Sequence, residues 1–230
     1  MPFYRPLLRR LFVLLFAYPI TLLWLGLNVR HRGRLPTAGP AIIAGNHNSH
    51  LDTLTLLSLY SLGVIPKVRP VAAADYFMKS GFMGWFSLNV VGIIPIVRRN
   101  KAKPMDGAAE NDPLEECYRA LERGEILVIF PEGTRGEPER MQQLKSGVAI
   151  LAAKYPTVPV CPVYMHGLGK SLPKGSTFPI PFFVDVYIGN PITWSGMHAS
   201  DPAVDKKSFM RELEARMLAQ KDKFEIKDFD

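Results

Sequence analysis

The sequence predicts an α/β fold: a single domain with a largely parallel sheet flanked by helices, preceded by an N-terminal membrane-associated helical hairpin. Short apolar runs alternate along the chain with longer helical patterns, which is typical of parallel sheets. The chain has 230 residues, of which 47% are hydrophobic, enough to bury the core of one large domain. An uncharged stretch at residues 11–27 precedes the first strand. We therefore assign residues 1–28 to a membrane-anchoring helical element and residues 29–230 to the α/β domain.

The uncharged stretch has basic residues on both sides, among them Arg10 and Arg30. As a helix, residues 11–27 cover about 26 Å, whereas the hydrocarbon core of a bilayer is about 30 Å thick. Basic flanks favour the cytoplasmic face for both ends, and Pro19 near the centre predicts a kink or a break. We therefore expect a monotopic or re-entrant hairpin on the cytoplasmic face of a membrane. A buried core helix is the alternative; a signal peptide is disfavoured because no small-residue cleavage site follows.

The first strand and helix after this element enclose the most informative motif. The apolar run 41–45 predicts a buried strand, and residues 52–59 predict a helix. His47 and Asp52 are five positions apart, a rotation of about 500° on a helix, so they cannot both lie within the helix and touch. We expect His47 in the turn and Asp52 in the first helical turn, with an N-cap at position 48 or 49.

A histidine titrates near neutrality, and a neighbouring carboxylate orients the ring and stabilises the imidazolium. His47 and Asp52 are therefore candidates for a general base with its orienting acid, the chemistry that activates a hydroxyl group. Three alternatives remain open. His47 can be an ordinary polar residue at a helix start; His47, His50 and Asp52 can be metal ligands, although no other histidine or cysteine cluster completes such a set; or His50 can be the base.

Further strands and helices follow in alternation. The prolines within residues 158–164 predict an edge strand or an irregular strand. The aromatic stretch 76–86 predicts core packing, with the wall of an acyl-chain site or a membrane-facing patch as alternatives. The remaining predicted strands are residues 68–73, 92–99, 126–130, 158–164 and 182–188, and the helices are residues 112–124, 144–155 and 203–219.

Polar residues follow the ends of two more strands. Because the carboxyl ends of parallel strands meet at one edge of a sheet, we expect these residues to share a crevice with His47 and Asp52. Arginines at this place suit phosphate, since the guanidinium fork matches its oxygens, and a glycine lets the backbone approach a ligand closely. Surface ion pairs are the alternative. The residues concerned are Arg98, Glu132, Gly133, Thr134 and Arg135.

The formal charge of +7 favours an anionic partner: nucleic acid, an anionic membrane surface or a phosphorylated small molecule. The basic residues flank apolar segments and strand ends rather than alternating with aromatic residues, so we expect no nucleic-acid binding. Cys117 and Cys161 are far apart and form no paired motif, which predicts neither a disulfide framework nor a zinc site. A reducing compartment is the expectation.

The order of four motifs resembles that of the glycerolipid acyltransferase family, typified by 1-acylglycerol-3-phosphate (lysophosphatidic acid) acyltransferases. The resemblance covers about residues 28–195, and the joint order of the motifs is more specific than any one alone. The chain departs from the family in having Gly136 where serine is frequent. The motifs are NHNSHLD at 46–52, GIIPIVR at 92–98, FPEGTR at 130–135 and VPVCPV at 158–163.

The resemblance implies a membrane-associated O-acyltransferase that moves a fatty acyl group from an acyl-CoA or acyl-carrier-protein thioester to the hydroxyl of 1-acylglycerol-3-phosphate, giving phosphatidic acid. It implies that His47 removes the proton, that Asp52 orients His47, and that no metal or other cofactor takes part. The oligomeric state stays open. Alternatives are another lysolipid acceptor, such as a lysophosphatidylglycerol-like lipid or a lyso-aminolipid, and more distantly a metal-dependent phosphoesterase or a non-catalytic lipid-binding protein. By the same likeness, the acceptor phosphate is held by Arg98, Glu132, Gly133, Thr134 and Arg135.

Overall fold

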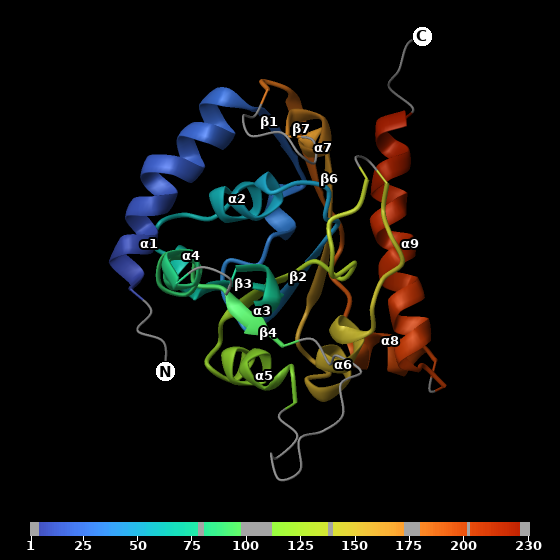
Figure 1. Cartoon of the computed structure of the whole chain (residues 1–230). Helices are drawn as coiled ribbons and strands as arrows, with labels where there is room; N and C mark the ends of the chain where they lie inside the picture. Colours follow the sequence, from blue (N-terminus) through green and yellow to red (C-terminus); the bar gives the residue numbers. More distant parts are fainter. Residues whose placement is uncertain are drawn as a thin grey trace.

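The computed structural model describes residues 5–77, 81–97, 112–137, 140–172, 180–201 and 203–225 (Figure 1). The strands are β1 (Gly26–Arg30), β2 (Ala41–Gly45), β3 (Val68–Ala73), β4 (Ile94–Ile96), β5 (Ile126–Ile129), β6 (Val160–His166) and β7 (Phe183–Ile188). The α-helices are α1 (Pro6–Phe12), α2 (Leu51–Ser58), α3 (Ala74–Phe77), α4 (Gly81–Phe86), α5 (Glu115–Glu122), α6 (Gly147–Lys154), α7 (Leu168–Ser171), α8 (Trp194–Ser200) and α9 (Lys206–Glu225). Wider π-helical segments are Val13–Ala17, Pro19–Trp24 and Ser87–Val91, and short 3-10 turns are Arg32–Arg34 and Ile65–Lys67.

Within the described residues, the strands form one sheet in the order β1-β7-β6-β2-β5-β3-β4. Strands β6, β2, β5, β3 and β4 are parallel, and β7 is antiparallel to β6 while β1 runs parallel to β7. Central strand β2 pairs with β5 and β6 and is buried at every position, as its continuous apolar sequence predicts. The predicted α/β fold with a largely parallel sheet is confirmed.

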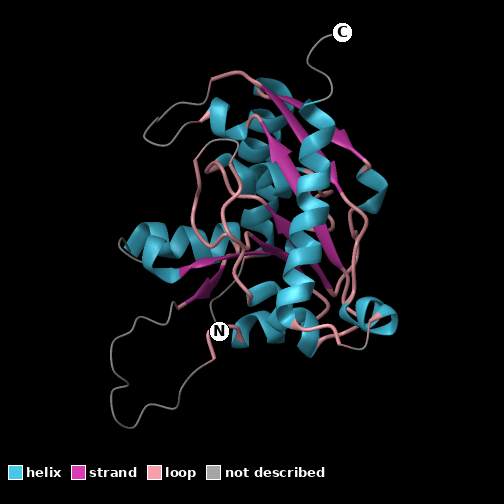
Figure 2. Ribbon diagram, turned by 90° about the vertical axis from the view of Figure 1, so that its right-hand side faces the viewer, coloured by secondary structure: helices cyan, strands magenta, loops and turns pink. Residues whose placement is uncertain are grey.

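Helices cover both faces of the sheet, as Figures 1 and 2 show. Alternation along β2 divides its side chains between two cores: Ile43 faces the N-terminal helix and α2, and Ile42 faces α5, α6 and α9. On the second face, α9 contributes its buried stripe of Phe209, Leu213 and Met217. The molecule thus has three layers, and the carboxyl ends of β2, β5 and β6 open between them.

The prediction of an edge position for residues 158–164 is wrong, because β6 lies between β2 and β7. The alternative of an irregular strand is confirmed. Val160 and Ile192 exchange both backbone hydrogen bonds, so the nitrogen of Pro162, two residues on, faces the same side. There Gly189, the residue after β7, donates its N–H to Pro162 O at 2.8 Å, and the proline has no N–H for a return bond.

The predicted N-terminal hairpin is wrong in one respect: the segment is a single helix, Pro6–Trp24, and Pro19 does not break it. The chain is wound wider on both sides of this proline. Tyr18 N–H donates to Val13 O, and Leu25 N–H donates to Ile20 O, each one residue further than in an α-helix. The wider turn makes room for the proline ring, which in an α-helix would clash with the carbonyl four residues earlier.

The sheet begins at Gly26, which pairs with Phe183 at the start of β7. Residues 26–28, which the sequence assigned to the anchoring element, are therefore part of β1. The other predicted strands lie within two residues of their observed bounds at most ends, but β4 is shorter than residues 92–99.

Candidate active site

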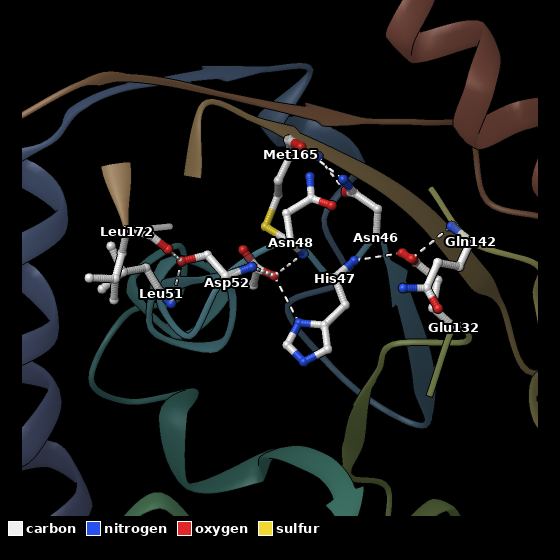
Figure 3. Close-up of polar contacts among 10 residues, drawn as sticks. Asn46, His47, Asn48, Leu51, Asp52, Glu132, Gln142, Met165 and Leu172 are labelled. Atoms are coloured by element: carbon white, nitrogen blue, oxygen red, sulfur yellow. Dashed lines mark hydrogen bonds and ion pairs between the residues drawn. The ribbon is translucent and has the colours of Figure 1, made fainter. Parts of the chain in front are cut away.

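His47 and Asp52 touch, as the sequence predicts. His47 Nδ1 lies 2.8 Å from Asp52 Oδ2, with His47 in the turn after β2 and Asp52 in the first turn of α2 (Figure 3). The side chain of Asp52 is 1% exposed, whereas that of His47 is 19% exposed. One end of the pair is therefore buried and the other is within reach of solvent, the arrangement that a proton acceptor with an orienting carboxylate requires.

The turn that carries His47 is held by hydrogen bonds to the backbone. Asp52 Oδ2 also accepts from the N–H groups of Asn48 and Ser49, at 2.7 and 2.8 Å. The predicted N-cap at position 48 or 49 is wrong: His50 precedes the helix, and the carboxylate of Asp52 reaches back to the turn instead. These hydrogen bonds from the backbone N–H groups to Asp52 hold the turn in place and keep the imidazole at the end of β2.

A buried amide joins the same turn to β6. Asn46 Nδ2 donates to Met165 O at 2.9 Å, and Met165 N–H donates to Asn46 Oδ1 at 2.7 Å. Asn46 is 1% exposed, so both bonds are shielded from water. The pair anchors the residue before His47 to the neighbouring strand.

The His47 ring stacks on Phe130, the residue after β5, with ring centres 4.3 Å apart and planes 17° from parallel. With Nδ1 directed at a carboxylate, the ring proton lies on Nδ1, and Nε2 carries the free lone pair. Figure 3 shows this second nitrogen turned away from Asp52, and the Asn48 side chain pointing to the opposite side. The atom that can accept a proton is therefore Nε2.

The pKa of Asp52 is raised, because burial disfavours the charged carboxylate. The hydrogen bond and the charge of His47 oppose this rise, as do the N–H groups of Ser49 and Asn48. A carboxylate held in a dry site by these donors interacts strongly with an imidazolium that forms beside it.

Glu132 links the turn after β5 to that after β2. Its Oε1 accepts from His47 N–H at 2.7 Å and its Oε2 accepts from Gln142 N–H at 2.8 Å, and the residue is 1% exposed. Burial raises the pKa of this carboxyl group, and the two N–H donors oppose the rise. Glu132 therefore positions the backbone of His47. The alternative of an ion pair between Glu132 and an arginine does not fit the described residues, because both carboxylate oxygens accept from backbone N–H groups.

The rest of the turn after β5 lies against the same residues. Gly133 has φ +72°, a conformation that favours glycine, and Gly136 N–H donates to His47 O at 3.0 Å. Thr134 Oγ1 lies 3.4 Å from Gln142 Oε1. Burial lowers the pKa of His50, and the positive charge of Arg135 lowers it further. Arg135 therefore lies near the start of α2. Arg98 lies outside the described residues.

The sequence identified these turns but missed the residues that hold them together. Phe130 and Asn46 lay in two of the quoted motifs but were given no role, and Gln142 lay in a polar loop outside them. Within the described ranges, no group of three or more His, Cys, Asp and Glu side chains could hold a metal ion. His50 is exposed, and His47 is the histidine whose ring contacts Asp52.

An α/β fold with a base of this kind at the carboxyl ends of its central strands defines a class of proteins that activate a substrate hydroxyl. Residues 26–166 match the family described as "Acyltransferase", and the chain belongs to that family.

Named relatives agree with this placement. The chain is 32% identical over 156 residues to the chloroplastic 1-acyl-sn-glycerol-3-phosphate acyltransferase LPAT1 of Arabidopsis thaliana, a match covering 65% of this chain and 38% of the relative. It is 30% identical over 155 residues to the lyso-ornithine lipid O-acyltransferase of Rhizobium meliloti, covering 66% of this chain and 48% of the relative. The match thus spans less than half the length of either relative.

The fold is also that of a solved structure. The crystal structure of the 1-acyl-sn-glycerophosphate acyltransferase PlsC from Thermotoga maritima superposes with a TM-score of 0.71 at 19% identity, covering 96% of this chain and 81% of that one. At this identity the likeness concerns the fold alone.

Proposed function

We propose that this chain is a membrane-associated O-acyltransferase that moves a fatty acyl group from an acyl-CoA or acyl-carrier-protein thioester to the hydroxyl of 1-acylglycerol-3-phosphate, giving phosphatidic acid. The observation that carries the proposal is the His47–Asp52 pair, whose Nε2 is free to accept a proton, in a chain of the acyltransferase family. Relatives named for this acceptor support the choice of substrate.

The chemistry requires no covalent intermediate on the protein, because a thioester carbonyl is already activated. Nε2 of His47 takes the proton of the acceptor hydroxyl while its oxygen attacks the thioester carbon. Asp52 stabilises the imidazolium. When the tetrahedral intermediate collapses, the C–S bond breaks and the imidazolium returns the proton to the thiolate, so that an ester and a thiol leave. No cofactor enters these steps. Arg98, Glu132, Gly133, Thr134 and Arg135 are proposed to form or support the site for the acceptor phosphate.

The N-terminal helix is proposed to lie on the membrane surface. Pro6–Trp24 is long and apolar enough to cross a bilayer. Its buried residues Arg9, Val13, Ala17 and Thr21 recur every four positions, so one side packs on the domain along most of its length. Leucines on the other side are exposed, including Leu15 at 61% and Leu23 at 84%. A helix held along the domain in this way presents its apolar side to one leaflet. Its basic flanks favour the anionic cytoplasmic surface.

The test is an assay of the purified protein in lipid vesicles with each donor class and a panel of lysolipids, with products identified by mass spectrometry. We expect phosphatidic acid from 1-acylglycerol-3-phosphate. Absence of any acylated lysolipid with either thioester would overturn the proposal.

A second acceptor has a specific observation in its favour, the similarity to a lyso-ornithine lipid O-acyltransferase. Competition of equal amounts of 1-acylglycerol-3-phosphate and lyso-ornithine lipid for one donor separates the two candidates. Preferential acylation of the ornithine lipid would assign the same chemistry to that acceptor. Loss of turnover on treatment with a chelator would instead favour the metal-dependent phosphoesterase.

A further inference from the structure

Lys145 lies across the glycine of the turn after β5. A Cβ atom placed on Gly133 would come within 2.6 Å of Lys145 Nζ, 3.0 Å of its Cδ and 3.1 Å of its Cε. The end of the lysine side chain therefore occupies the space that a glycine leaves open. The close approach expected at Gly133 is made by this side chain.

The backbone holds Lys145 in this place. Lys145 N–H donates to Pro131 O at 2.8 Å, and Gln142, three residues earlier, donates its N–H to Glu132. The segment that carries Lys145 is thus bonded to the same turn that bonds to His47. Its ammonium group lies over the residue between Glu132 and Thr134, close to the catalytic turn rather than at a remote surface.

No carboxylate of the described residues forms an ion pair with Lys145. Both oxygens of Glu132 accept from backbone N–H groups, and Glu137, further along the same loop, pairs with Arg140. Among the residues that the structure describes, the side-chain ammonium group of Lys145 has no hydrogen-bond or ion-pair partner. Arg135, two residues after Gly133, adds a second positive charge to the turn. The ammonium group of Lys145, beside a buried carboxylate whose oxygens are bonded to backbone N–H groups, is therefore available to an anionic ligand.

We propose that Lys145 is a binding residue for the phosphate of the acceptor, with its ammonium held over Gly133 so that it contacts the phosphate together with the turn that ends at Arg135. This inference rests on the proposed function. It adds a residue that lies outside the four sequence motifs, ten positions beyond Arg135. In this proposal His47 removes the proton, whereas Lys145 binds the phosphate headgroup and takes no part in proton transfer.

The test compares Lys145→Met with Lys207→Met, an exposed lysine of α9 on the other side of the sheet. Acylation is measured in mixed micelles while the mole fraction of 1-acylglycerol-3-phosphate is varied, and then while the donor is varied. A charge-assisted contact to phosphate is worth about a tenfold change or more. We expect Lys145→Met to raise the acceptor KM about tenfold and to leave the donor KM and Tm unchanged, and Lys207→Met to change none of these.

An unchanged acceptor KM in Lys145→Met would overturn the inference, as would an equal rise in both KM values, which a merely structural loss would produce. Lys145→Arg keeps the charge and should retain an acceptor KM nearer to that of the original protein; an Arg variant as impaired as the Met variant also counts against charge recognition. If the unmodified protein does not acylate 1-acylglycerol-3-phosphate, the proposed function fails first, and this outcome is distinct from activity with an unaffected KM.

Discussion

In the His47–Asp52 pair, the atom that accepts the proton, Nε2, is accessible, whereas the carboxylate that orients the ring is buried. The carboxylate is almost fully buried and accepts hydrogen bonds from the imidazole and from two backbone N–H groups. These hydrogen bonds hold the imidazole ring in one orientation and leave Nε2 free. The stacking of Phe130 on the His47 ring limits the rotation of that ring further. A well-ordered base is prepared before substrate binds, which lowers the entropic part of the barrier.

Replacement of His47 by alanine removes the proton acceptor. We expect kcat to fall by about 10²–10⁴-fold, the range that general base catalysis supplies. The backbone N–H groups of Asn48 and Ser49 still donate to the Asp52 carboxylate in this variant, so we expect it to stay folded and to bind vesicles. Initial rates with a saturating thioester check the expectation. Turnover within tenfold of the original would show that another group removes the proton.

Glu132 predicts a dependence of stability on pH. Because burial raises its pKa above the ordinary value of 4.5, the folded state holds its proton to higher pH than the unfolded state does. The unfolded state then binds fewer protons in the interval between the two pKa values, and the free energy of unfolding falls as pH rises through it. Glu132→Gln removes this titration.

Urea unfolding at a series of pH values from about 4 upward checks the sign. Stability of the original protein relative to Glu132→Gln should be highest at the acid end and should decrease as pH rises. A relative stability that increases with pH would show that the N–H groups of His47 and Gln142 outweigh burial.

Among the elements, the turn after β2 is held to β6 by the side chain of Asn46. Asn46 exchanges two hydrogen bonds with the backbone of Met165, 119 residues away. Asn48, two positions later, is also buried, yet its amide oxygen and nitrogen have no partner among the described residues. Asn46 is therefore expected to stabilise the fold, whereas the buried amide of Asn48 is expected to cost stability.

Asn46→Ala leaves a buried N–H and a buried C=O without partners, so we expect the free energy of unfolding to fall by about 1–3 kcal/mol. Asn48→Ala removes a buried amide that bonds to nothing described, so stability should be nearly unchanged or increase. Denaturant unfolding of both variants measures the difference. Equal losses in the two would contradict the importance of the Asn46 bridge.

The N-terminal helix packs on the domain along one side and is exposed along the other. Its inward side belongs to the core together with α2 and β1, and exposed apolar residues run along its outer side. The aromatic stretch predicted at residues 76–86 ends beside it: Phe86 packs edge-on against Phe12 at 5.4 Å, while Trp85 is 43% exposed. The exposed apolar residues of the N-terminal helix and of α4 thus form one apolar surface instead of lying singly over the molecule.

Leu15→Glu combined with Leu23→Glu should weaken binding to anionic vesicles by about tenfold or more, because each leucine loses the free energy of apolar burial and gains a charge repelled by the surface. Leu218→Glu on α9, at 36% exposed, is the matched control and should bind as the original protein does. Vesicle sedimentation measures the partitioning. An equal effect of Leu218→Glu would assign the loss to net charge rather than to the helix.

The sequence by itself determined every described strand of the sheet except β1, the position of the turn after β2 and the contact of His47 with Asp52. These follow from local rules: apolar continuity marks a buried strand, and the geometry of five residues excludes both partners from one helix. His47 and Asp52 lie close together in the sequence, so their contact can be predicted without knowing which strands are neighbours in the sheet.

Only the tertiary structure decided that Glu132 holds the backbone of His47, 85 residues away, that Lys145 lies over Gly133, and that β6 is an interior strand. It also replaced the predicted hairpin by one helix, since the wider turns around Pro19 are stabilised by packing on the domain and not by the proline itself. The physical reason is common to all four. Each depends on which distant segments become neighbours once the strands have been ordered in the sheet, and neither hydropathy nor residue spacing contains that order.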